Sequence, residues 1–100
     1  MNAEDLTVIR SPEACQIQAD CHDLASEVGV PLESVYWSRN MVHTSAPFLL
    51  NLNVSGISPI RQLEFTQEEI EGYLTGQTTT AVKEKIRAEL AAALPDLEEH

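Results

Sequence analysis

Long apolar runs are missing from this sequence, in which the longest uninterrupted apolar stretches span four or five residues, as at Ala91–Leu94. A helix that crosses a membrane needs roughly 20 such residues, so the sequence predicts no transmembrane segment. Glu4 and Asp5 stand where a secretory signal would place basic residues before an apolar stretch. We therefore expect a cytoplasmic protein with no membrane partner.

Positive charge is also scarce. Six Lys and Arg residues face sixteen Asp and Glu residues, and the formal net charge is −10 at pH 7. Such a chain repels DNA, RNA and anionic lipid unless its few cations gather on one face. Arg10, Arg39 and Arg61 are isolated in the sequence, and the other cations share one predicted helix with acidic residues. The charge pattern therefore disfavours nucleic acid as a partner.

Cysteine and glycine are too few, or too scattered, to build the usual sites. Cys15 and Cys21 are the two cysteines, and the absence of a secretory signal predicts that both are reduced. They fall in one predicted helix, about 9 Å apart along its axis. A disulfide needs Cα atoms within about 7 Å, so the two cannot form one while the helix is intact. The four glycines form no phosphate-binding loop, and we predict no cofactor.

Apolar residues make up 43% of the 100-residue chain, which is enough for one hydrophobic core. We predict a single α+β domain over residues 1–95, followed by a frayed acidic tail over 96–100. The expected order is β-α-β-β-β-α-α, with a small antiparallel sheet of three to four strands, an N-terminal helix and two C-terminal helices. An exposed edge of such a sheet invites a partner strand, often from a second copy.

The boundaries of these elements come from periodicity and capping residues. Thr66 and Glu69 form a capping box, and Phe65 with Ile70 adds a hydrophobic staple at the same helix start. Glu33–His43 fits a strand, with a short helix after Pro31 as the alternative. Before it we expect a strand at Leu6–Arg10 and a helix from Ser11 to Gly29. After it we expect a hairpin, with Phe48 to Val54 in one strand and Leu63 and Phe65 in the other. Two helices follow: a short one from Thr66 to Gly76, whose apolar side is Ile70, Tyr73 and Leu74, and a last one from Thr78–Thr80 to Pro95.

The middle of the chain has an unusual charge pattern, because residues 34–63 contain no Asp or Glu. Aromatic residues, methionine and arginine are enriched where interfaces are anchored. We therefore predict that a partner contacts this segment at Tyr36, Trp37, Arg39 and Met41. The alternative for Trp37 is that it fills the core of the sheet, since a small domain with few aromatics needs them inside.

Two other functions deserve comparison with this one. Residues 24–43 resemble the core of a helix-turn-helix DNA-binding motif, with Ala25, Gly29 and Val35 at the expected spacing. The second helix of that motif would offer only Arg39 and His43 to phosphates. Cys15, His22 and His43 could instead serve a small enzyme or a metal site, but their spacing fits no structural zinc pattern and no catalytic motif.

The function that remains is a non-catalytic protein-interaction module, a small acidic regulator, inhibitor or adaptor of another protein. We expect it to form a homodimer through a strand edge or through the last helix.

Overall fold

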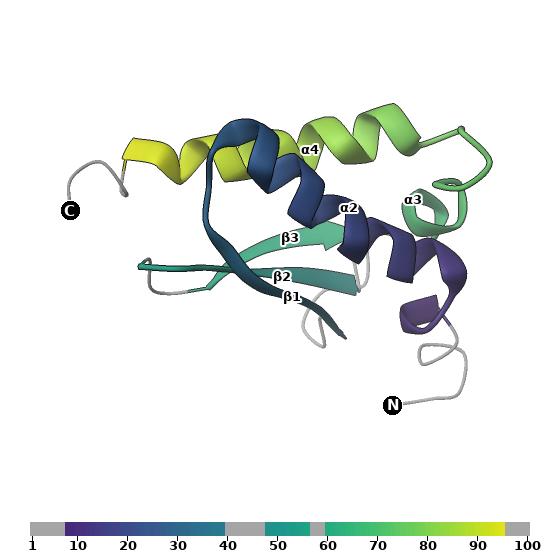
Figure 1. Ribbon diagram of the computed structural model, residues 1–100. Coiled ribbons are helices and arrows are strands. Elements are labelled where there is room, and N and C mark those ends of the chain that lie inside the picture. Colours follow the sequence, from purple (N-terminus) through teal and green to yellow (C-terminus); the bar gives the residue numbers. More distant parts are fainter. Residues whose placement is uncertain (1–7, 40–47, 57–59, 96–100) are drawn as a thin grey trace.

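The computed structural model in Figure 1 describes residues 8–39, 48–56 and 60–95. Its described elements are helix α2 (Pro12–Val28), strands β1 (Leu32–Arg39), β2 (Phe48–Val54) and β3 (Arg61–Phe65), and helices α3 (Gln67–Glu71) and α4 (Thr79–Ala92). The three strands form one antiparallel sheet in the order β1-β2-β3. The predicted α+β class is confirmed, with three strands in the described part of the chain.

Helix α2 begins and ends at the residues that the sequence predicts. The Ser11 side chain accepts a hydrogen bond from the Ala14 N–H at 3.2 Å, and Pro12 occupies the first helical position. Gly29 has φ +89°, a left-handed conformation that glycine adopts without steric cost, and its N–H donates to the Ala25 carbonyl. One side of α2 is buried, with Ala14, Ile17, Cys21 and Leu24 in it, whereas Cys15 is exposed.

The strand predicted at Leu6–Arg10 is wrong over its described part, because Val8 and Ile9 are helical and Arg10 lies in a turn. Ser11 explains the difference. Its N–H and its hydroxyl both donate to the Val8 carbonyl, at 3.2 and 2.6 Å, which turns the chain directly into α2. Val8 is 8% exposed and packs in the core. The β-branched residues therefore supply apolar surface here and do not form a strand.

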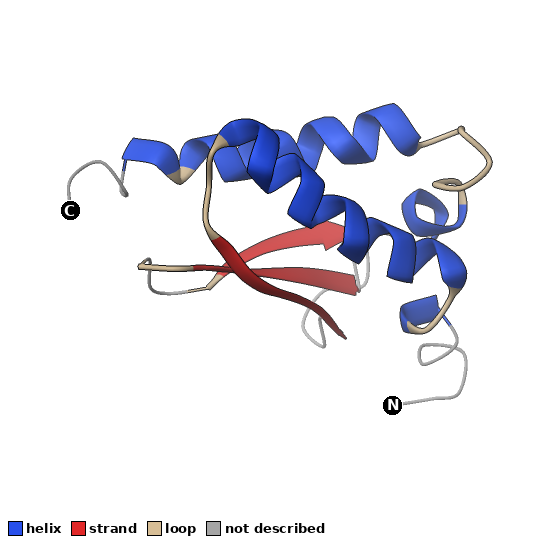
Figure 2. Ribbon diagram, viewed as in Figure 1, coloured by secondary structure: helices blue, strands red, loops and turns tan. Residues whose placement is uncertain are grey.

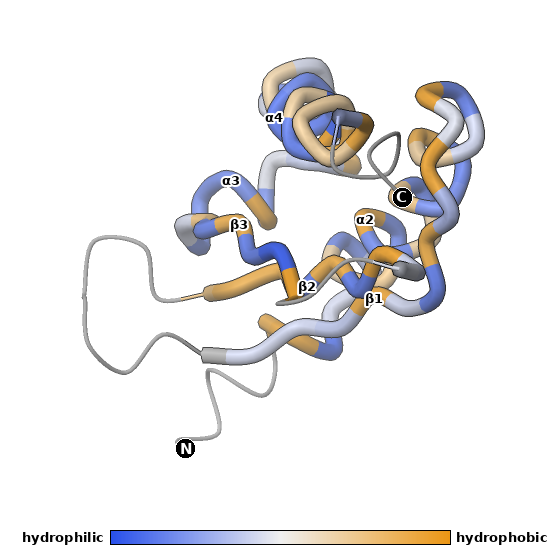
Figure 3. The backbone as a smooth tube through the Cα atoms, turned by 90° about the vertical axis from the view of Figure 1, so that its left-hand side faces the viewer, coloured by the Kyte–Doolittle hydropathy of each residue, from blue (hydrophilic) through white to orange (hydrophobic). Residues whose placement is uncertain are grey.

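The two layers of the molecule are the sheet and the helices, which lie on one side of it (Figure 2). Figure 3 shows the same arrangement from the side, with α2 and α4 next to each other over the sheet. The core between the layers takes alternate residues of β2 and one stripe from each long helix. Its fully buried members include Ile17, Cys21, Phe48, Leu50, Leu52, Phe65, Ile70, Val82, Ile86 and Leu90.

Helix α3 starts at the predicted capping box. The Thr66 hydroxyl accepts from the Glu69 N–H at 3.2 Å, and the Glu69 carboxylate accepts from the Thr66 N–H at 2.9 Å. Phe65 and Ile70 on either side of this cap are both fully buried, as expected for a staple. Lys85 of α4 lies 4.2 Å from the centre of the Phe65 ring and 3.6 Å from the Glu69 carboxylate, which ties the cap to α4.

We expect Thr66→Ala to lower the free energy of unfolding by about 1 kcal/mol, because it removes the acceptor for an amide at the helix start. Urea unfolding of the variant measures the change. Thr80→Ala is the matched control, since Thr80 is exposed in the first turn of α4. An equal loss in the two variants would contradict a specific role for the cap.

The second predicted helix is shorter than expected, because α3 ends at Glu71 and not near Gly76. The N–H of Tyr73 donates to the Ile70 carbonyl, and the N–H of Thr78 donates to the Gly72 carbonyl. A Cβ at Gly72 would lie 2.9 Å from the Thr78 side chain, so this close turn needs glycine. Tyr73 is buried beyond the helix end, whereas Leu74 is 53% exposed and does not join the apolar side as predicted.

The last helix begins where the sequence predicts and ends at Ala92, before the predicted end at Pro95. Its cap lies at Thr78, the first of the three threonines proposed, and Val82, Ile86 and Leu90 are buried along one side. The predicted tail at 96–100 lies outside the described residues.

Candidate interaction surface

One face of the sheet has none of the described helices over it, and we call it the outer face (Figure 1). The strand register assigns its residues, because paired residues point to the same side. One row across the sheet consists of Tyr36, Asn51 and Gln62, and the next of Ser38, Leu49 and Glu64. Ser34 and Asn53 complete the outer face.

Asn51 lies at the centre of the outer face, yet it is only 1% exposed. Its side-chain amide donates to the Tyr36 carbonyl at 3.1 Å and to the Ser38 hydroxyl at 2.9 Å. Its side-chain oxygen accepts from the Gln62 amide at 2.8 Å. Both ends of this amide are therefore bonded, and they join all three strands. A buried polar group with its partners in place fixes the pairing of neighbouring strands.

Tyr36 stands beside this network and is 45% exposed. It is one of three large apolar or aromatic side chains with such exposure in the described residues, and the others are Ile60 and Leu74. Tyr36 alone among them belongs to the outer face. An aromatic side chain on a rigid polar surface is a common anchor for a protein partner.

Trp37 does not share this surface, although it follows Tyr36 in the sequence. Successive residues of a strand point to opposite faces, and Trp37 is 8% exposed in the core. Its indole N–H donates to the Ala14 carbonyl at 3.0 Å, and its ring meets Phe65 edge-on with centroids 5.7 Å apart. The core alternative for Trp37 is the one that this packing favours, so we leave Trp37 out of the candidate surface.

The other two predicted contact residues have less structural support. Arg39 is the last residue of β1 and pairs with Phe48 of β2. Met41 lies outside the described residues. Of the four predicted contact residues, Tyr36 is thus the one whose side chain is exposed on the outer face, and residue 39 is placed only as the end of β1.

The acidic residues of the described chain lie mainly on the helices. Glu13, Asp20, Asp23 and Glu27 belong to α2, and further acids belong to α3 and α4. On the outer face, Glu64 is the one charged residue that the register assigns. The stretch without acidic residues in the sequence therefore corresponds largely to β1, β2 and the outer face.

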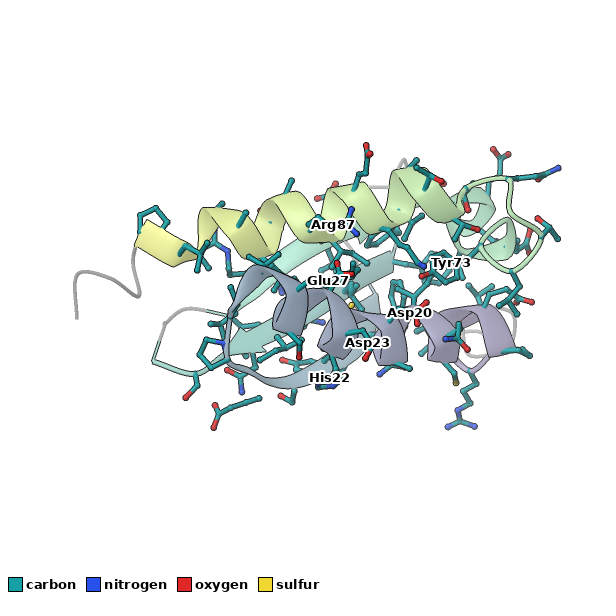
Figure 4. The ribbon with its side chains drawn as sticks, turned by 45° about the horizontal axis from the view of Figure 1, so that its top comes forward. Asp20, His22, Asp23, Glu27, Tyr73 and Arg87 are labelled. Atoms are coloured by element: carbon teal, nitrogen blue, oxygen red, sulfur yellow. The ribbon has the colours of Figure 1, made fainter. Side chains whose placement is uncertain are left out.

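On the helical side of the molecule, two polar contacts connect α2 with the turn after α3 and with α4 (Figure 4). The Tyr73 hydroxyl donates to the Asp20 carboxylate at 2.5 Å, and Arg87 lies 3.2 Å from the Glu27 carboxylate. The Glu27 and Arg87 side chains are about half exposed, so solvent screens this ion pair and it adds little stability. These contacts join elements that are distant in sequence, and the sequence carries no local signal for them.

The residues of the enzyme or metal alternative are not brought together in the described part of the chain. Cys15 and His22 are exposed on α2, and Figure 4 shows His22 on the side of that helix away from α4. His43 lies outside the described residues. Among the residues that the structure places, no group of three or more His, Cys, Asp and Glu side chains could hold a metal ion.

The helix-turn-helix interpretation of residues 24–43 is wrong over residues 32–39, and residues 40–43 lie outside the described residues. Its recognition helix would begin after Pro31, but Leu32–Arg39 is strand β1. The strand forms because Val35 and Trp37 contact the core while Ser34, Tyr36 and Ser38 pair with β2 on the outer face.

Comparisons with known proteins add no further assignment: no family model, curated protein or solved structure matches this chain. No helix among the described residues is long and apolar enough to span a membrane.

Proposed function

We propose that this chain is a non-catalytic protein-interaction module, a small acidic regulator, inhibitor or adaptor, and that it binds its partner through the outer face around Tyr36. The observation that supports this most is the position of Tyr36, which is 45% exposed on a sheet face with little charge. Removing charged groups from water is costly, so a surface with few of them is easier to cover with a partner.

The rigidity of the surroundings strengthens the proposal. Tyr36 belongs to the same row as Asn51 and Gln62, whose side chains are bonded to each other at 2.8 Å. A surface that is already ordered loses less conformational entropy when a partner binds. The tyrosine ring itself has few rotatable bonds and adds a large contact area at low entropic cost.

The negative net charge of the chain favours a partner of opposite charge. The described helices, which lie on the other side of the sheet, carry most of the acids of a chain with net charge −10. A partner with positive net charge and an apolar or aromatic contact surface would therefore be attracted over a distance and would then dock on the weakly charged sheet.

The test compares proteins captured from lysate by the immobilised full chain, by Tyr36→Ala and by Leu74→Ala, with and without nuclease. Leu74 is the matched control, because it is similarly exposed but lies between α3 and α4. We expect Tyr36→Ala to weaken retention of a nuclease-resistant protein by at least about tenfold, as for an interface anchor. We expect Leu74→Ala to retain it.

Equal retention by both variants would contradict the assignment of the outer face. A captured species that disappears with nuclease would favour nucleic acid over protein as the partner.

A further inference from the structure

Each edge strand of the sheet accepts a hydrogen bond from a side chain of a helix. In the described chain, β1 and β3 are the two edge strands. The Gln18 amide of α2 donates to the Val35 carbonyl of β1 at 3.0 Å. The Lys85 ammonium group of α4 donates to the Glu64 carbonyl of β3. Outward-directed backbone groups of an edge strand are otherwise a template on which another strand can pair.

The Val35 carbonyl is directed away from the central strand β2. In an antiparallel ladder, successive residues of a strand direct their N–H and C=O groups to opposite sides. The Val35 carbonyl is directed to Gln18 of α2. The next residue, Tyr36, is therefore directed to its partner Asn51 on β2.

The same alternation places the Glu64 carbonyl on the opposite edge. Asn51 is directed to β1, so Leu50 on β2 is directed to β3 and to its partner Leu63. The residue after Leu63 is Glu64, whose carbonyl is therefore directed away from β2. This is the carbonyl that Lys85 reaches. The strand register and the two side-chain hydrogen bonds thus agree across the whole sheet.

We propose that Gln18 and Lys85 close the two edges of the sheet to strand addition, whether by a second copy of the chain or by another protein. An added strand bonds to the outward-directed groups of an edge, which include the Val35 and Glu64 carbonyls. It would have to displace the helix side chain that already occupies that carbonyl. This inference opposes the expected homodimer through a strand edge. It does not rest on the proposed function, which concerns the outer face.

A neighbouring contact holds each of the two side chains near its edge. The Trp37 indole N–H donates to the Ala14 carbonyl at 3.0 Å, about one helical turn before Gln18, and so holds β1 against this part of α2. Lys85 lies 4.2 Å from the centre of the Phe65 ring. A side chain that is already positioned loses less conformational entropy when it forms its hydrogen bond.

The two side chains oppose strand addition by different means. The Gln18 amide is neutral and competes with an incoming N–H for the Val35 carbonyl. Lys85 carries a positive charge, which an added strand on β3 would have to remove from water. Lysine on an edge strand, or beside one, protects many native sheets from aggregation.

Sedimentation velocity of the full chain in reducing buffer tests the inference with Gln18→Ala and Lys85→Ala. We expect each variant to self-associate at least about tenfold more tightly than the wild type, because two copies can then pair without displacing two side chains. The double variant opens both edges of every copy. We expect it to form assemblies larger than a dimer, since each copy can then pair on two sides.

Matched variants separate an opened edge from a general loss of stability. Gln18→Lys retains a donor at the β1 edge, and Lys83→Ala makes the same charge change as Lys85→Ala at another position of α4. Thr66→Ala weakens the fold without removing either side chain. We expect these three variants to associate like the wild type. Alanine is a strong helix former, so Gln18→Ala and Lys85→Ala should keep their helices, which circular dichroism verifies.

Hydrogen exchange locates the new contact in Gln18→Ala. We expect the outward-directed amides of Val35 and Trp37 to exchange more slowly in the associated form than in the dilute monomer. Wild-type association in both Gln18→Ala and Lys85→Ala would overturn the inference. Equal association of Thr66→Ala, or association of Gln18→Ala without slower exchange in β1, would also overturn it.

Discussion

Trp37→Ala is expected to lower the free energy of unfolding by about 3 to 5 kcal/mol, which is the cost of truncating a large buried aromatic side chain. Trp37 is 8% exposed, meets Phe65 edge-on and donates its indole N–H to Ala14 of α2. The substitution therefore leaves a cavity between β1 and α2 and removes the hydrogen bond to the Ala14 carbonyl. Urea unfolding, followed by far-ultraviolet circular dichroism, measures the loss.

Tyr36→Ala is the control for Trp37→Ala, because it changes the neighbouring aromatic residue on the opposite face. Tyr36 is 45% exposed, and we expect its truncation to change stability by less than about 1 kcal/mol. The two variants thus separate folding from binding within a single strand. If Trp37→Ala were as stable as the wild type while partner binding was lost, Trp37 would belong to the interface after all.

Alkaline pH is expected to destabilise the protein through Cys21. Burial raises the pKa of the Cys21 thiol from 9.0 to about 12, and the nearby Asp20 carboxylate adds to the effect. Burial and the hydrogen bond to Asp20 also raise the pKa of Tyr73 above its ordinary value. Both groups therefore hold their protons in the folded state at pH values where the unfolded chain releases them.

The sign of the effect follows from proton linkage. The folded pKa of Cys21 is the higher one, so its contribution to stability is fully present below pH 9.0 and is lost as pH rises toward about 12. Within that interval Cys21 alone lowers the free energy of unfolding by up to about 1.4 kcal/mol per pH unit.

Urea unfolding in reducing buffer between about pH 8 and about pH 11 measures this slope. Cys21→Ala is expected to be less stable near neutrality but to have a shallower alkaline slope than the wild type. Cys15→Ser, which changes the exposed cysteine, should keep the wild-type slope. A Cys21→Ala variant with an unchanged slope would show that other groups cause the alkaline loss.

The elements that the sequence predicts correctly are those with a local physical cause. Ser11 and Gly29 bound α2, and Thr66 with Glu69 starts α3, through contacts within a few residues. The alternation along Phe48–Val54 likewise identifies a strand with one buried face. These signals need no knowledge of the rest of the chain.

The errors arise where burial in the core or a turn contact overrides the propensity of the local sequence. Val8 and Ile9 have high strand propensity, but Val8 packs into the core from a helical turn. Leu74 fits the apolar side of a helix that stops at Glu71, because Thr78 closes onto Gly72. Neither contact is visible in the local sequence.

The candidate site was only partly predictable for the same reason. The stretch without acidic residues and its aromatic residues point to β1, but not to which of Tyr36 and Trp37 is exposed. Asn51 reads in the sequence as an outward polar residue of an alternating strand, whereas it is buried and bonded to Ser38 and Gln62. Those partners depend on strand order, which the sequence does not specify.

Hydroxyl-radical footprinting tests the central claim most directly, by comparing oxidation of Tyr36 in the free chain and in its associated form, whether with a captured partner or with a second copy. The account predicts that Tyr36 oxidation falls on association, while that of exposed Leu74 stays the same. Unchanged oxidation of Tyr36 together with protection on α2 or α4 would contradict it and would move the interface to the helical side.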